Sequence, residues 1–152
     1  MPEAPLSHSD PQIVLAFDFG LRRLGLAAGD TVTRSAQGLR ALICRDGVPD
    51  WQEVRREVNR AGALQLVVGC PYNDDGSLGP IALRARAFAA ELQSRTGLPV
   101  HLVDERYSSL DAQDLLRSQR QSGQRRARVQ KVDVDAMAAA LILERWFAGE
   151  IS

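Results

Sequence analysis

Hydrophobic residues along this chain fall in short runs that predict β-strands separated by polar turns and helices. Residues 13–17 and 24–28 are apolar, and the glycine-containing segment between them is typical of a β-hairpin. Further apolar runs at residues 39–44, 64–70 and 100–103 predict three more strands. The pattern therefore predicts five strands, the first two of them antiparallel.

Helix signals lie between and after these strands. Asp50 is a favourable N-cap with Glu53 three residues later, and Pro80 suits the first turn of a helix. The expected helices span about residues 50–62, 80–97 and 133–147, with another that begins near residue 109. A hairpin followed by alternating strands and helices predicts an α/β fold, in which a mixed five-stranded sheet carries helices on both faces.

The composition is that of a soluble globular domain, with 45% hydrophobic and 25% charged residues in 152. Residues 1–11 contain three prolines and predict a loose N-terminal tail, followed by one domain over residues 12–149. Apolar runs are too short to span a membrane and no signal-peptide pattern opens the chain, so we expect a cytoplasmic protein with no membrane partner. Cys44 and Cys70 have apolar neighbours, which predicts buried, reduced thiols.

Acidic residues at the ends of apolar segments are the main chemical signal. Asp18 ends the first apolar run, and a carboxylate there is costly unless a cation or ligand compensates it. The pair Asp104 and Glu105 follows another strand, and Asp135 lies in the last helix. Carboxylates on three core elements predict a divalent-metal centre, and Mg²⁺ and Mn²⁺ prefer oxygen ligands.

Periodicity separates the two acids of the last helix. Asp135 shares a helical stripe with four apolar residues and should face the sheet. These are Ala138, Ala139, Ile142 and Trp146. Asp133 falls on roughly the opposite side, so we expect it to be the helix N-cap.

Two further acidic segments stay ambiguous on the residues alone. Strand alternation sends the Asp104 and Glu105 side chains to opposite faces, and it does not say which face looks toward Asp18. Asn73 and the two aspartates that follow it could reach the same edge of the sheet. They are better interpreted as turn formers before Gly76.

Net charge is zero, but the basic residues are unevenly distributed. The segment 117–131 has no acidic residue and six basic ones, which are Arg117, Arg120, Arg125, Arg126, Arg128 and Lys131. It is interpreted either as a solvated loop or as a phosphate-binding loop. A basic loop beside an acidic metal site is what a phosphodiester-cutting enzyme requires.

Four segments in the expected order resemble the YqgF/RuvX family. Residues 18–27 are similar to its D-x-G-x-x-R-[IL]-G-[VL]-A opening, and residues 67–76 to its V-V-G-x-P-x-N-x-x-G element. Residues 103–112 resemble V-D-E-R-x-[ST]-[ST]-x-x-A, and residues 134–143 resemble V-D-x-x-A-A-x-x-I-L. Departures are mild, with Cys70 and Tyr72 where leucine is usual.

The resemblance implies a ribonuclease H-like fold and a metal-dependent nuclease related to Holliday-junction resolvases. By position in the motifs, Asp18, Glu105 and Asp135 would be both the catalytic acids and the metal ligands. Glu105 is thereby chosen over Asp104, and two Mg²⁺ or Mn²⁺ ions are expected with substrate. The residues expected to bind nucleic acid are Arg22, Arg23, Arg106, Arg125, Arg126, Arg128 and Lys131. The second tier of site residues is Asp104, Asn73 and Asp133.

The implied substrate is structured nucleic acid, either the 5′ end of pre-16S rRNA or a four-way DNA junction. A homodimer would suit two symmetric cuts in a junction. One alternative is a non-catalytic RNA-binding module for ribosome assembly, but such a module has no reason to bury three acids beside a polyanion. The other is an actin-like nucleotide-binding ATPase, which needs two lobes where this chain has length for one.

Overall fold

The computed structural model describes residues 11–73, 75–104 and 131–149, the first three residues of the last range by backbone alone. These residues form one six-stranded sheet with the strand order β4-β3-β2-β1-β5-β6. The strands are β1 (Ile13–Asp18), β2 (Arg23–Asp30), β3 (Ala36–Arg45), β4 (Val48–Pro49), β5 (Ala63–Cys70) and β6 (Val100–Asp104). The four strands from β4 to β1 pair antiparallel, and β1, β5 and β6 pair parallel.

The sixth strand was not predicted. β4 is only two residues long and pairs with the end of β3 across the turn at Asp46 and Gly47. Both turn residues have positive φ, at 49° and 81°, which is the backbone of a tight hairpin turn. The five longer strands were all predicted, with boundaries that differ by a few residues.

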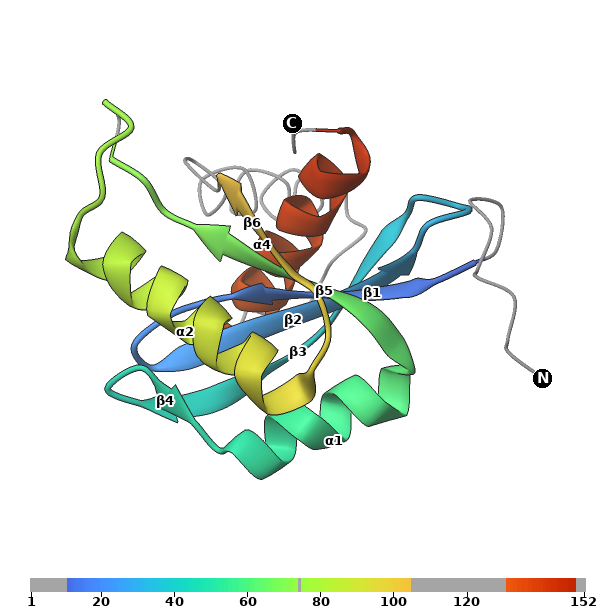
Figure 1. Ribbon diagram of the computed structural model, residues 1–152, viewed down its shortest axis with the longest axis horizontal. Coiled ribbons are helices and arrows are strands. Elements are labelled where there is room, and N and C mark those ends of the chain that lie inside the picture. Colours follow the sequence, from blue (N-terminus) through green and yellow to red (C-terminus); the bar gives the residue numbers. More distant parts are fainter. Residues whose placement is uncertain (1–10, 74, 105–130, 150–152) are drawn as a thin grey trace, which may run out of the picture.

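Three helices are described, and they cover both faces of the sheet as predicted (Figure 1). α1 (Trp51–Ala61) and α2 (Pro80–Thr96) lie on one face, and α4 (Lys131–Phe147) lies on the other. The Asp50 side chain accepts a hydrogen bond from the Gln52 backbone N–H, which confirms it as the N-cap of α1. The helix expected near residue 109 lies outside the described residues. None of the described helices is long and apolar enough to cross a membrane.

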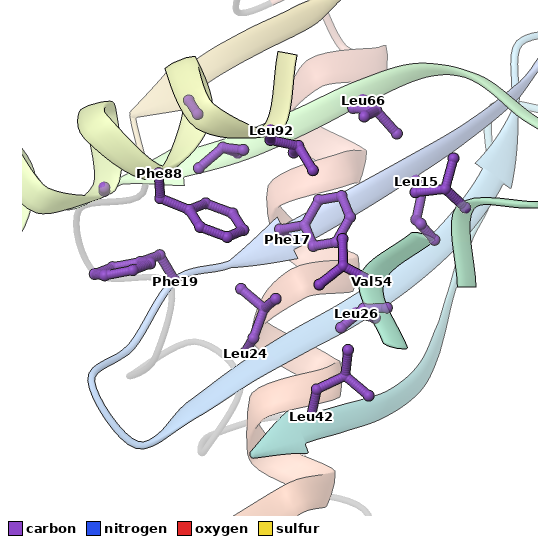
Figure 2. Close-up of a cluster of buried hydrophobic side chains, with 14 of the residues drawn as sticks. Leu15, Phe17, Phe19, Leu24, Leu26, Leu42, Val54, Leu66, Phe88 and Leu92 are labelled. Atoms are coloured by element: carbon purple, nitrogen blue, oxygen red, sulfur yellow. The ribbon is translucent and has the colours of Figure 1, made fainter. Parts of the chain in front are cut away.

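Alternation along β1 sorts its side chains between the two faces. Leu15 and Phe17 join the larger core with α1 and α2, where the Phe17 and Phe88 rings meet edge to face with centroids 6.0 Å apart (Figure 2). Val14 and Ala16 pack instead with side chains of α4. Asp18 follows in the same alternation as Val14 and Ala16, so it belongs to the α4 face at the carboxyl end of β1.

The N-terminal half of α4 packs directly against glycine backbone in the sheet. A Cβ on Gly25 of β2 would overlap the backbone carbonyl of Asp135, and a Cβ on Gly38 of β3 would lie 3.0 Å from the carbonyl oxygen of Ala136. Side chains at these positions would push the helix away from the sheet. The two glycines therefore set the distance between α4 and strands β2 and β3, and β2 is the hydrogen-bonded neighbour of the strand that ends in Asp18.

We expect Gly25→Ala to destabilise the protein by roughly 3 kcal/mol, because the new methyl group meets helix backbone that cannot rotate away. Gly38→Ala is the matched control and should cost only about 1 kcal/mol, since its neighbours need to yield by a few tenths of an ångström. Urea unfolding followed by tryptophan fluorescence measures both. Equal stabilities of the two variants would contradict the close packing at Gly25.

Candidate active site

Asp18 lies at the carboxyl end of β1, an interior strand of the sheet. It is the last residue of β1 and pairs in register with Gly25 on one side and Gly69 on the other. The parallel strands β1, β5 and β6 all end at this edge, which is where open α/β sheets bind their ligands. Asp18 is partly exposed and lines an open cleft of about 490 Å³.

Asp135 reaches the same cleft from α4. Its backbone carbonyl lies against Gly25, the register partner of Asp18, so the two acidic residues are brought together by one glycine. Three members of the predicted stripe are buried, because Ala138, Ala139 and Ile142 have 1%, 0% and 0% exposure. The fourth, Trp146, is partly buried and packs against the core on the α4 face. The helical periodicity thus identified the acid that shares the cleft with Asp18.

Arg23 provides the charge partner of Asp135. Its Nε donates to Oδ2 of Asp135 at 2.5 Å, and the two side chains are 29% and 21% exposed. Arg22, by contrast, is exposed at the rim of the same cleft. The ion pair was not predicted, since its members are 112 residues apart in the sequence.

The second-tier acid Asp104 lies on the other face of the sheet. Its alternation partner Leu102 packs with the core under α1 and α2, and its register partner is Cys70. Burial, and to a smaller extent the charge of Asp104, raises the pKa of the Cys70 thiol. The backbone carbonyl of Asp104 accepts a hydrogen bond of 2.9 Å from Arg145 of α4. Asp104 therefore helps to join α4 to β6, and its side chain is not on the face of Asp18.

Asn73 organises the loop after β5. Its Nδ2 donates to the Ser77 hydroxyl at 3.0 Å, and its backbone N–H donates to the Ser77 carbonyl at 2.9 Å. Asp75 accepts from the Ser77 backbone N–H at 2.9 Å. These bonds agree with the interpretation of the segment as a turn. Asp74 lies outside the described residues.

Asp133 is not the helix N-cap, and that prediction is wrong. The described part of α4 already includes Lys131, so Asp133 lies inside the helix. Several predicted site residues fall outside the described residues, namely Glu105, Arg106, Arg125, Arg126 and Arg128. For Lys131 and Asp133 the structure describes the backbone alone.

Hydrogen bonds from the β3–β4 hairpin support the loop between β1 and β2. The backbone N–H of Gly47 donates to the Leu21 carbonyl at 2.9 Å, and that of Cys44 donates to the Arg22 carbonyl at 2.8 Å. The hairpin is joined in turn to α2, because Arg84 donates to both the carboxylate and the carbonyl of Asp46. This support was not predicted, although the Asp-Gly pair is a recognised hairpin signal.

The donor set in the cleft fits a hard divalent cation. Asp18 and Asp135 supply carboxylate oxygens, which Mg²⁺ and Mn²⁺ prefer. Within residues 11–73, 75–104 and 131–149, no group of three or more His, Cys, Asp or Glu side chains is placed to hold a metal ion. Among the described residues, Asp18 and Asp135 are the two carboxylates that line this cleft.

Comparison with known proteins identifies the family. A family model described as "RuvX: Holliday junction resolvase" matches residues 12–149. The chain belongs to the RuvX family. RuvX relatives from Coxiella burnetii and Edwardsiella ictaluri, both named "Putative pre-16S rRNA nuclease", are 44% identical over 134 residues and 43% identical over 141 residues. These matches cover 88% and 93% of this chain, and 91% and 98% of the relatives.

The fold comparison agrees with the family. T. thermophilus RuvC in complex with a Holliday junction substrate resembles this chain with a TM-score of 0.52 and 20% identity, over 93% of this chain and 96% of RuvC. The ribonuclease H-like α/β fold predicted from the RuvX motifs is thereby confirmed.

Both cysteines of this RuvX chain are free and buried, as predicted. Burial raises the pKa of Cys44 to about 11, and it also raises the pKa of Cys70. Both groups thus remain protonated thiols near neutral pH, and a thiol is a poor nucleophile compared with a thiolate. Cys70 precedes Pro71 of the cleft in the sequence, but it does not line the cleft itself.

We expect neither thiol to react readily with a disulfide reagent in the native protein at pH 8, since the thiolate of Cys44 would be a fraction of about one in a thousand at that pH. In denaturant both thiols should react at the rate of free cysteine. Absorbance of the released reagent measures the two rates. Rapid labelling of Cys70 in the native state would contradict its burial beneath α2.

Proposed function

We propose that this RuvX-family chain is a metal-dependent endonuclease that hydrolyses phosphodiester bonds in structured nucleic acid. The observation that supports the proposal most strongly is the meeting of Asp18 and Asp135 at one edge of the sheet through the shared contact with Gly25. Two carboxylates in an open cleft, with Arg22 and Arg23 beside them, suit the binding of a divalent cation and a polyanion together.

Asp18, Asp135 and Glu105 are the proposed metal ligands. Glu105 is preferred to Asp104 because Asp104 shares the face of Leu102, away from α4. In the two-ion arrangement Asp18 would be shared, and Glu105 and Asp135 would hold one ion each. Bound Mg²⁺ or Mn²⁺ would supply an activated water and stabilise the charge on the leaving oxygen.

The remaining proposed residues bind and orient the nucleic acid. Arg22 lies exposed at the rim of the cleft and can contact a phosphate without disturbing the acids. The other proposed phosphate contacts are Arg23, Arg106, Arg125, Arg126, Arg128 and Lys131. Contacts of this kind fix the position of the backbone and carry little sequence information.

The proposed substrate is the 5′ region of pre-16S rRNA in the bacterial cytoplasm. This choice is supported by relatives at 43–44% identity that are named "Putative pre-16S rRNA nuclease". The description of the family model favours a second candidate, the four-way DNA junction, for which a homodimer would suit paired cuts. Metal chemistry and phosphate contacts are shared by the two substrates. Parallel assays with a labelled precursor rRNA fragment and a labelled junction, in Mn²⁺, Mg²⁺ or EDTA, therefore decide between them.

We expect Asp18→Asn and Asp135→Asn each to lower the cleavage rate by more than about 100-fold, because each removes a charged metal ligand and several kcal/mol of transition-state stabilisation. Asp133→Asn is the matched control, with the same change of charge one half-turn away on α4, and it should stay within about threefold of wild type. Single-turnover cleavage in Mn²⁺ measures all three.

Folding must be checked by thermal unfolding in the same buffer. Near wild-type cleavage by Asp18→Asn would contradict the proposed site. Nucleic-acid binding by wild type with no metal-dependent cleavage of either substrate would favour the binding module instead.

A further inference from the structure

The ion pair between Arg23 and Asp135 lies inside the cleft, and each of its residues belongs to an element whose backbone is fixed in the fold. Arg23 is the first residue of β2 and stands two positions before Gly25, so both face α4. Asp135 is held against Gly25 by the carbonyl contact. The Nε to Oδ2 distance is 2.5 Å, and both side chains are partly buried, at 29% and 21% exposure. This arrangement differs from an ordinary surface pair, whose long side chains find each other only transiently.

A carboxylate in this position has two competing uses. When Asp135 is paired with Arg23, its negative charge is compensated in the metal-free protein. Without Arg23, this charge would share the cleft with the carboxylate of Asp18. Bound to a divalent cation, it would bring that cation close to the guanidinium group. Two positive groups a few ångströms apart repel each other strongly in a partly buried site. The guanidinium must then move away from Asp135 or weaken the binding of the cation.

We propose that Arg23 is a resident counter-ion, which neutralises Asp135 until a divalent cation displaces it and which then binds a phosphate of the nucleic acid. The proposal rests on the function proposed above and adds a role for one residue of the same site. The exchange moves no proton and breaks no covalent bond. The divalent cation replaces the Arg23 guanidinium at the Asp135 carboxylate, and the guanidinium then pairs with a phosphate of the nucleic acid.

The exchange couples metal binding to nucleic-acid binding. A phosphate that binds Arg23 leaves Asp135 available to the cation. Conversely, a cation that binds Asp135 leaves Arg23 available to the phosphate. By linkage each ligand raises the affinity of the site for the other by the same factor. The site would therefore bind metal weakly when alone and more tightly when the substrate is present.

The first test is the affinity of the free protein for Mn²⁺, followed by electron paramagnetic resonance of unbound Mn²⁺ in the absence of nucleic acid. We expect Arg23→Gln to bind Mn²⁺ about fivefold or more tightly than wild type, because a competing positive charge has been removed. Arg22→Gln is the matched control, since it removes the same charge from an exposed neighbour. Its effect should stay below about twofold, because solvent and salt screen exposed charges.

Three further measurements isolate the pair. In EDTA, Arg23→Gln should melt at a lower temperature than Arg22→Gln, and Mn²⁺ should raise its melting temperature by more. Combining Arg23→Gln with Asp135→Asn should remove the gain in Mn²⁺ affinity, as expected of a direct interaction. Arg23→Lys should fall between wild type and Arg23→Gln, because lysine keeps the charge and loses the planar guanidinium. This conservative variant also serves if Arg23→Gln does not fold.

The transfer to phosphate is tested with a precursor rRNA fragment whose binding is recorded before cleavage, with the uncleaved fraction checked on a gel. Mn²⁺ should tighten the binding of this fragment to wild type, and the gain should be smaller in Arg23→Gln than in Arg22→Gln. Weaker Mn²⁺ binding by Arg23→Gln would overturn the exchange and show that Arg23 orients Asp135 for the metal. Wild type that binds no Mn²⁺ and cleaves neither substrate with metal would contradict the proposed function itself.

Discussion

The contact between the backbone of α4 and Gly25 is the constraint on which the site depends. Gly25 pairs in register with Asp18 in the sheet. Because Gly25 has no side chain, the Asp135 carbonyl can pack directly against its backbone. One residue thus positions two acids that come from opposite ends of the chain. Gly38 extends the same close approach to β3, so α4 packs closely on both strands at Asp135 and Ala136. A larger side chain at either position would separate the acids before it disturbed the rest of the core.

The two faces of the sheet have different roles, one in stability and the other in the candidate site. Leu15, Phe17 and their partners under α1 and α2 form the larger core, which carries the hydrophobic stabilisation. On the α4 face, at the carboxyl end of β1, Asp18 and Asp135 line an open cleft. Grouping like charges there opposes folding, and the Arg23 guanidinium offsets part of that cost. A site suited to bind cations and phosphates is thus maintained by a core that lies on the other side of the sheet.

Much of this could be predicted from the sequence, because the signals were local. Apolar runs located the five longer strands, and helical periodicity placed Asp135 toward the sheet. The choice between Asp104 and Glu105 could not come from alternation alone, since it requires knowing which core Leu102 joins. The Arg23–Asp135 pair and the hydrogen bonds from the β3–β4 hairpin to the loop after Asp18 were also missed. They join segments distant in the chain, and no local pattern encodes them.

The most direct measurement of the central claim is anomalous diffraction from crystals of the wild-type protein soaked in Mn²⁺, recorded at the manganese edge. An ion held by the two acids gives an anomalous peak between the Asp18 and Asp135 carboxylates, and the peak is lost in crystals of Asp18→Asn. A protein that cleaves with Mn²⁺ in solution, but whose only anomalous peak lies elsewhere on the surface, would contradict the assignment of these acids to the metal.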